Sequence, residues 1–143
     1  MVEIVVLSGA GLSAESGLGT FRDAGGIWTK YDLAEVATPE GFAADPAKVH
    51  AFYNARRANC RDAAPNPAHH ALARLEAAFG DDVMIVTQNI DDLLERAGVR
   101  GAVHMHGELM RALCHACGHR WPAPERMAAS DPCPTCGAAA TRP

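Results

Sequence analysis

Two pairs of cysteines near the end of the sequence have the spacing of a metal site. Cys114 and Cys117 form one Cys-x2-Cys pair, and Cys133 and Cys136 form the second. Each pair can supply two thiolates to a tetrahedral zinc ion, and the residues between the pairs close the site. Because four thiolates leave no open position for a substrate, we expect structural Zn2+. Two disulfides or a redox-active pair remain as alternatives.

Three further residues with metal-binding or redox-active side chains are expected to have simpler roles. His115 and His119 lie close to the cysteine pairs, but a shell of four thiolates has no place for them. We therefore expect both histidines at the surface. Cys60 stands alone in a charged stretch and is expected to be a partly buried side chain without chemistry.

A glycine-rich loop near the start of the chain could bind phosphate groups. Gly9 and Gly11 follow a short apolar run, as in a dinucleotide-binding turn, but Ala14 stands where the usual third glycine is required. No acidic residue ends a second strand where a Rossmann enzyme binds the adenine ribose. Backbone N–H groups of the loop could still hold phosphates. Either a dinucleotide binds here in an unusual way, or the loop is a turn without a ligand.

Two polar stretches later in the chain could carry catalytic side chains. Residues 87–91, TQNID, end an apolar run with amides and an acid, although Asn89 or Asp91 could simply cap the next helix. Residues 104–107, HMHG, place two histidines in a predicted strand, where alternation puts His104 and His106 on the same face. A histidine in a strand can equally be structural.

Apolar patterning predicts the elements that must position these residues. Buried parallel strands are expected over residues 3–8, 82–90 and 102–107. Residues 19–26 are expected to form a flexible loop, and residues 27–42 short pieces broken by Pro39. One helix is expected to open near Ser13, and further helices are expected over residues 45–60, 66–80 and 91–98. Asp45 and Asn66 are the expected N-caps, each followed by a proline, Pro46 or Pro67, at the first helical position. Gly80 and Gly98 are expected to end the second and third of these ranges.

This order of elements predicts an α/β fold: a partial Rossmann-like parallel sheet with helices, plus a small zinc-ribbon-like module. We expect residues 1–110 to form the sheet domain, with an inserted helical segment at about 28–65, and residues 111–143 to form the zinc module. The last stretch has too few large apolar residues for a core without metal. Ligands of parallel sheets bind at the carboxyl ends of strands. Gly9, the segment 88–91 and His106 all fall at such ends.

Charge and composition exclude some classes of function. The chain has 143 residues, 48% of them hydrophobic, which is enough for one main core, and its net charge is −4. A negative chain lacks the basic surface that nucleic-acid binding requires. No run reaches the roughly 18 apolar residues of a membrane span, and the start lacks a basic segment with a cleavage site. We expect a soluble cytoplasmic protein with no membrane or nucleic-acid partner.

The order of the motifs resembles the sirtuins, the NAD-dependent protein-lysine deacylases. The resemblance rests on GAG-x-S from Gly9, TFRD from Thr20, QNID from Gln88, HG at His106, and the two Cys-x2-Cys pairs. It implies NAD as co-substrate, structural Zn2+ and acylated-lysine proteins as substrates. It also implies that the glycine loop holds NAD, with Phe21 and Arg22 beside the nicotinamide ribose. The implied cofactor-binding residues are Gly9, Ala10, Gly11, Glu15, Thr20, Phe21, Arg22, Trp28, Gln88, Asn89, Ile90 and Asp91.

The resemblance further implies a mechanism. The amide oxygen of the acyl-lysine attacks the ribose and expels nicotinamide. His106 resembles the general base that deprotonates a ribose hydroxyl, a task that suits imidazole near neutral pH. That hydroxyl attacks the acyl carbon, and water releases lysine and O-acyl-ADP-ribose. Asn89 resembles the residue that orients ribose and water, Asp91 the partner of the nicotinamide carboxamide, and Gln88 a ribose contact.

One short stretch suggests which acyl group is removed. Tyr53 and Arg56 are three residues apart on a predicted helix, so both side chains can point into the same pocket. A phenol and a guanidinium together can bind a carboxylate, although an ordinary amphipathic helix would also explain the pair. The pair resembles that of the class III sirtuins, which remove succinyl and malonyl groups. Ala37 resembles the small residue that leaves their acyl pocket wide.

The resemblance stops at the end of the sequence, where sirtuins continue into further strands and the segments that bind the adenosine half of NAD. We therefore expect the C-terminal remainder of the family domain to be missing, which would leave an unpaired apolar edge on the sheet. Two alternative functions follow from this expectation and from the shared NAD chemistry. One is a non-catalytic, zinc-stabilised module that binds ligands, and the other is an NAD-dependent ADP-ribosyltransferase.

Overall fold

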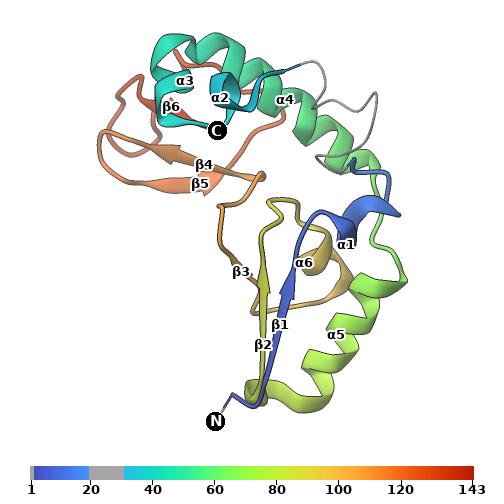
Figure 1. Cartoon of the computed structure of the whole chain (residues 1–143). Helices are drawn as coiled ribbons and strands as arrows, with labels where there is room; N and C mark the ends of the chain where they lie inside the picture. Colours follow the sequence, from blue (N-terminus) through green and yellow to red (C-terminus); the bar gives the residue numbers. More distant parts are fainter. Residues whose placement is uncertain (1, 20–30) are drawn as a thin grey trace. The chain divides into compact units, whose positions relative to one another are not determined.

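A computed structural model describes residues 2–19 and 31–143, which divide into two compact units (Figure 1). Unit 1 comprises Met1–Asp23 and Cys60–Glu108, and unit 2 comprises Ala24–Asn59 and Leu109–Pro143. Each unit is therefore built from two separate stretches of the chain. The cysteine-rich end shares a unit with the helices that precede residue 60. Within the described residues, no helix is long and apolar enough to cross a membrane.

Unit 1 contains the parallel sheet that the sequence predicts. Its strands are β1 (Ile4–Ser8), β2 (Val83–Thr87) and β3 (Val103–His104), in the order β1-β2-β3. All neighbouring strands run parallel, so their carboxyl ends lie at one edge of the sheet. The predicted third strand is shorter than expected, because the chain turns directly after His104 and Gly107 has a φ of 86°.

Helices cover one face of this sheet. They are α1 (Gly11–Ala14), α5 (Pro67–Phe79) and α6 (Leu93–Ala97), with the 3-10 helix η2 (Gly80–Asp82) leading into β2. Ile85 of β2 packs in a buried cluster with Leu94 and Val99. The helix expected to open near Ser13 begins two residues earlier and lasts one turn. Figure 1 shows α5 running alongside the sheet, with α6 beside it.

The ends of α5 and α6 form as their local sequences predict. The Asn66 side chain accepts hydrogen bonds from the backbone N–H groups of Ala68 and His69, and Pro67 is the first helical residue of α5. Gly80 ends α5 with a φ of 55°. Gly98 ends α6 in the left-handed region, with a φ of 110° that disfavours side chains.

The second face of the sheet is apolar and exposed. Val5 and Leu7 of β1 are 64% and 63% exposed, and Met84 of β2 and Val103 of β3 are also exposed. The strand register places Val5 beside Met84 and Leu7 beside Val86, so these side chains share one face. Parallel sheets normally have both faces covered. This face therefore leaves apolar side chains of unit 1 exposed to water.

Unit 2 begins with short helices and continues into a long one. They are α2 (Leu33–Val36), α3 (Pro39–Ala44) and α4 (Pro46–Asp62), whose last residues belong to unit 1. The predicted interruption lies at residues 37–38, and Pro39 opens α3 instead of ending a helix. Gly41 allows α2 and α3 to approach closely, since a Cβ at Gly41 would lie 2.3 Å from the carbonyl oxygen of Glu35. Asp45 accepts from the N–H of Lys48, as predicted for the start of α4.

An antiparallel sheet completes unit 2. Its strands are β4 (Arg111–Cys114), β5 (Arg120–Pro122) and β6 (Thr141–Arg142), in the order β5-β4-β6. Two contacts attach α4 to this cysteine-rich segment: His50 bonds the carbonyl oxygen of Thr141 through Nε2 at 3.1 Å, and Asn54 bonds the backbone of Met127. The segment is therefore supported by α4 as well as by its own short strands.

Candidate functional site

Polar residues gather at the carboxyl edge of the parallel sheet. Gln88, which follows β2, donates its backbone N–H to the carbonyl oxygen of Ser8 at 2.9 Å, and Met105, which follows β3, donates to that of Thr87 at 3.0 Å. A Cβ at Gly9 would lie 3.4 Å from the Gln88 side-chain oxygen. The edge thus brings together the segments after β1, β2 and β3, where ligands of parallel sheets bind.

The Ser13 hydroxyl is the centre of a polar network at this edge. It donates to Asp91 Oδ2 at 2.9 Å and accepts from Asn89 Nδ2 at 3.2 Å. Its third neighbour is His69 Nε2 at 3.3 Å. Ser13 is 2% exposed. One side chain from α1 therefore holds both Asn89 and Asp91, the two residues of the QNID stretch expected to be catalytic.

The hydrogen bonds assign the protonation state of His69. Its Nδ1 lies 3.1 Å from the backbone nitrogen of Asn66, which can only donate, so Nδ1 must be an acceptor. Nε2 then carries the proton and donates to Ser13. Burial lowers the pKa of His69, although the nearby Asp91 carboxylate opposes this effect. The ring is therefore neutral, and the capping box of α5 aims it at Ser13.

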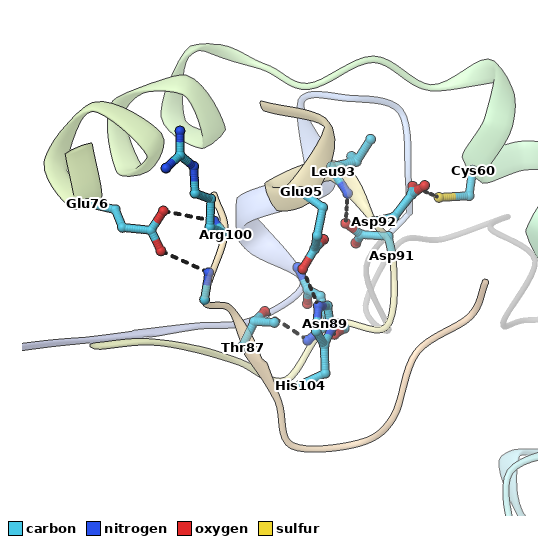
Figure 2. A network of polar contacts seen from close by, with 11 residues as sticks. Cys60, Glu76, Thr87, Asn89, Asp91, Asp92, Leu93, Glu95, Arg100 and His104 are labelled. Atoms are coloured by element: carbon cyan, nitrogen blue, oxygen red, sulfur yellow. Dashed lines mark hydrogen bonds and ion pairs between the residues drawn. The ribbon is translucent and has the colours of Figure 1, made fainter. Parts of the chain in front are cut away.

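A second histidine connects β3, the segment after β2 and α6 at the same edge, as Figure 2 shows. His104, the last residue of β3, lies with Nδ1 2.8 Å from the carbonyl oxygen of Asn89 and Nε2 2.8 Å from Glu95 on α6. Asn89 also donates its backbone N–H to Thr87 Oγ1 at 3.0 Å. The hydrogen bond to Glu95 raises the pKa of His104 to about 9.

The predicted cofactor residues fall into three groups. Gly9, Ala10, Gly11 and Glu15 lie in or beside α1, with Ala10 as its N-cap and Glu15 as its C-cap. Thr20, Phe21, Arg22 and Trp28 lie outside the described residues. Gln88 is exposed beside Asn89, Ile90 and Asp91.

His106 is exposed in the turn that follows β3. The sequence placed it on the same strand face as His104 by alternation, but the strand ends at His104, so strand alternation does not extend to His106. His106 nevertheless follows the carboxyl end of a parallel strand, as expected. Its position is set by the turn and by the hydrogen bond from the Met105 N–H to Thr87.

The predicted acyl-selectivity residues lie in unit 2. The Arg56 guanidinium lies 6.0 Å from the Tyr53 ring centroid and 5.8 Å from that of Phe52, so Tyr53 and Arg56 share one side of α4. Tyr53 is half-buried, and burial raises the pKa of its phenol while Arg56 lowers it. Ala37 is exposed at the C-terminal end of α2.

The four predicted zinc ligands come together in unit 2. The sulfurs of Cys114 and Cys136 are 3.7 Å apart and those of Cys117 and Cys133 are 3.8 Å apart, and all four lie within 4.8 Å of one another. Disulfide sulfurs would be about 2.05 Å apart. A tetrahedral zinc ion with Zn–S bonds of about 2.3 Å places its sulfurs about 3.8 Å apart. The donor set therefore fits tetrahedral zinc.

Both cysteine pairs use the same turn. The N–H of Gly118 donates to the carbonyl oxygen of Cys114 at 2.8 Å, and the N–H of Gly137 donates to that of Cys133 at 2.9 Å. The two glycines have φ angles of 75° and 74°, which favour glycine over other residues. A glycine directly after each pair was a signal that the sequence analysis did not use.

The histidines near the cysteines and the single Cys60 lie outside the cysteine cluster. Among the described residues, the group able to hold one metal ion consists of the four cysteines alone. His115 is exposed, and His119 stacks on Trp121 with an interplanar angle of 11°. Cys60 is fully buried instead of partly buried, its sulfur is 3.4 Å from Asp92 Oδ1, and burial raises its pKa to about 12. A thiol with so high a pKa is a poor nucleophile.

Ser13 and His69 are two polar residues of this site to which sequence reasoning assigned no role. Both are buried polar side chains, yet neither stands out from its neighbours. Ser13 belongs to the GAG-x-S motif, and His69 stands at the third helical position after Asn66, where a capping-box partner is found. The capping box was therefore the available signal for His69.

Comparison with known proteins agrees with these motifs. Residues 9–142 match the Sir2 family. The chain belongs to the Sir2 family. An NAD-dependent protein deacylase of Caulobacter vibrioides is 60% identical over 125 residues, which are 85% of this chain and 52% of that protein. One from Bdellovibrio bacteriovorus is 50% identical over 136 residues, covering 94% of this chain and 58% of that protein.

Solved structures of the Sir2 family have the same fold. A Sir2 homologue in complex with ADP ribose has a TM-score of 0.85 at 40% identity, covering 98% of this chain and 56% of that one. A Sir2 homologue–NAD complex has a TM-score of 0.83 at 41% identity, covering 98% and 54%. The Rossmann-like α/β prediction and the resemblance to sirtuins are thus confirmed. The chain spans about half the length of the curated relatives it matches.

Proposed function

We propose that this chain carries catalytic and NAD-binding residues of an NAD-dependent protein-lysine deacylase. The observation that carries the proposal is the junction at Ser13, where the hydroxyl contacts both Asn89 and Asp91 at the carboxyl edge of the sheet. Relatives at 50–60% identity are named NAD-dependent protein deacylases. An amide and a carboxylate held by one buried hydroxyl are preorganised before any ligand binds, which lowers the cost of binding.

The residues at the edge fit NAD as a co-substrate. The segment Gly9–Gly11 lies beside Gln88, and a Cβ at Gly11 would meet no atom of the described residues within 4 Å. When bound, NAD supplies a ribose carbon that loses nicotinamide. We assign Asp91 to the nicotinamide carboxamide and Asn89 to the ribose and water. Solved structures of Sir2 homologues contain NAD or ADP ribose.

His106 is proposed as the general base. It is exposed and follows β3, so its imidazole is accessible to a substrate hydroxyl. Deprotonation of that hydroxyl allows attack on the acyl carbon, and water then releases the lysine. Thr20, Phe21, Arg22 and Trp28 are proposed to complete the cofactor site.

Tyr53 and Arg56 are proposed to bind a carboxylate on the acyl group, which gives activity toward succinyl- and malonyl-lysine in addition to acetyl-lysine. Their shared side of α4 supports this assignment, since a guanidinium 6.0 Å from the phenol ring and a phenol hydroxyl can bind one carboxylate together. Ala37 is proposed to leave room for the larger acyl group. Acylated-lysine proteins are the proposed substrates.

The four cysteines are proposed to bind one structural Zn2+. Their sulfur separations suit a closed tetrahedral shell, which stabilises a segment with a small apolar core. Thiols that act as metal ligands are typical of a reducing compartment, which supports the expected cytoplasmic location.

The test compares the chain alone with a fusion to the remaining part of the Caulobacter vibrioides relative. Each is incubated with NAD and with an acetylated or succinylated peptide, and the products are identified by mass spectrometry. Nicotinamide and O-acyl-ADP-ribose are expected from the fusion, and His106→Ala should abolish both. ADP-ribose attached to the peptide would indicate a transferase instead. Ligand binding without nicotinamide release would indicate a non-catalytic module.

A further inference from the structure

Both ring nitrogens of His104 face groups that can only accept a hydrogen bond. Nδ1 lies 2.8 Å from the carbonyl oxygen of Asn89, and Nε2 lies 2.8 Å from an oxygen of Glu95 (Figure 2). A neutral imidazole carries one N–H and can donate to only one of these two oxygens. An imidazolium carries two N–H groups and can donate to both. The side chain of His104 is 7% exposed, so water cannot easily replace either partner. The geometry therefore requires the charged form.

The electrostatic surroundings support this form. Glu95 on α6 is in direct contact with the ring, and Glu108 in the segment after β3 also favours the charged form of His104. The hydrogen bond to Glu95 raises the pKa of His104 to about 9, against the opposing effect of burial. Arg96, the cation next to Glu95, is bonded to the carbonyl oxygens of Cys60 and Ala63.

His104 acts on Asn89 through the backbone. The carbonyl group of Asn89 is held by His104, its N–H by Thr87 Oγ1 at 3.0 Å, and its side-chain nitrogen reaches Ser13 Oγ at 3.2 Å. Fixing both backbone groups fixes the direction in which the side chain leaves the chain. His104, which joins Asn89 to β3 and α6, thus holds one of the two backbone groups that set this direction.

We infer that His104 is a positioning residue, which Glu95 holds in the imidazolium form so that it anchors the Asn89 carbonyl and aims the Asn89 amide at Ser13. The inference rests on the proposed function, because Asn89 is assigned there to the ribose and water. It adds His104 to the site as a residue whose charged form fixes the position of Asn89 before NAD binds.

The experiment uses the whole chain and needs no nucleotide. NMR follows the His104 ring nitrogens and the Asn89 side-chain amide signals between pH 6 and 10. In the unaltered chain both sets of signals should change with one midpoint near 9. In Glu95→Gln both midpoints should fall together by about one to three pH units, because the opposite charge is lost. Glu3→Gln, an exposed acid elsewhere in unit 1, is the matched control and should leave both midpoints unchanged.

Two outcomes would overturn the inference. One is a His104 midpoint near its ordinary value of about 6.5 in the unaltered chain. The other is Asn89 side-chain signals that do not follow the His104 titration. His104→Gln keeps one hydrogen-bond donor and should make the Asn89 signals independent of pH. If this variant does not fold, the titrations of the unaltered chain and of Glu95→Gln still decide the question. NAD binding by the fusion is measured separately: its absence would contradict the proposed function without altering the NMR result.

Discussion

The side chain of Asn54 on α4 pairs with both backbone groups of Met127. Its Nδ2 donates to the Met127 carbonyl oxygen at 2.9 Å, and its Oδ1 accepts from the Met127 N–H at 2.9 Å. Met127 is buried in the segment between the two cysteine pairs. The Asn54 amide is therefore one of the contacts that attach the helix carrying Tyr53 and Arg56 to the proposed zinc segment.

Asn54→Ala should destabilise unit 2. The substitution leaves two backbone groups of Met127 without partners, and an unsatisfied buried polar group costs about 1–3 kcal/mol. Chemical denaturation and the hydrogen-exchange rate of the Met127 amide measure the effect. Asn59→Ala, at an exposed position of the same helix, is the control and should change stability little. Unchanged exchange at Met127 would mean that the pairing does not hold the segment.

Removal of one zinc ligand should release the metal. The purified chain is expected to contain about one zinc ion per chain, and Cys114→Ser or Cys136→Ser should contain none, because three thiolates cannot close the shell. Elemental analysis after gel filtration measures this ratio. Cys60→Ala is the matched control, since Cys60 lies outside the cluster and should not affect metal content. A metal-free chain with unit 2 folded would contradict the zinc assignment.

Arg56→Met should reduce desuccinylation much more than deacetylation. A charge-assisted contact contributes about 1.5–3 kcal/mol, which corresponds to a roughly ten- to hundredfold loss in kcat/KM. Tyr53→Phe should lose less, because one neutral hydrogen bond disappears. The assay compares succinylated and acetylated forms of one peptide with the fusion protein.

Arg61→Met, at an exposed position of the same helix, is the control for these variants. Equal losses on both substrates would make Tyr53 and Arg56 structural residues and would remove the carboxylate-binding proposal, while the deacylase proposal would stand.

His69 should make the chain less stable in mild acid. Burial lowers the pKa of His69, so below its ordinary value of about 6.5 the unfolded chain takes up a proton that the folded chain resists. The stability contributed by neutral His69 is complete above pH 6.5 and is lost as the pH falls toward the lowered folded-state value. His69→Gln should flatten this part of the stability profile.

Urea unfolding between pH 5 and 8 measures the profile. His106→Gln, at an exposed position in the turn after β3, should retain the slope of the unaltered chain. An identical slope in His69→Gln would show that other groups cause the acid sensitivity.

The exposed sheet face should make the chain associate with itself. Val5→Thr with Leu7→Thr places β-branched residues at both strand positions while reducing apolar area, so association should weaken and stability should change little. Sedimentation across a concentration series measures association. Val6→Thr, on the covered face, should instead lower stability by about 1–3 kcal/mol. A monomeric unaltered chain at high concentration would contradict this prediction.

Local sequence was sufficient for the class of fold and for several element ends. Asn66, Pro67 and Gly98 act on backbone groups within a few residues, so their effects could be predicted without knowledge of the rest of the chain. The cysteine spacing predicted the cluster for the same reason, since each pair forms its own turn. The motif order predicted the Sir2 family, but Thr20, Phe21, Arg22 and Trp28 lie outside the described residues and their roles remain predictions.

Tertiary structure alone decided which polar groups meet. Ser13 and His69 are 56 residues apart, and Asn54 and Met127 are 73 apart, and no local pattern specifies such partners. The paired histidines of HMHG have different surroundings because the strand ends between them, which is set by the turn after β3 and not by apolar alternation. Buried polar groups require partners, and the fold determines which partners are within reach.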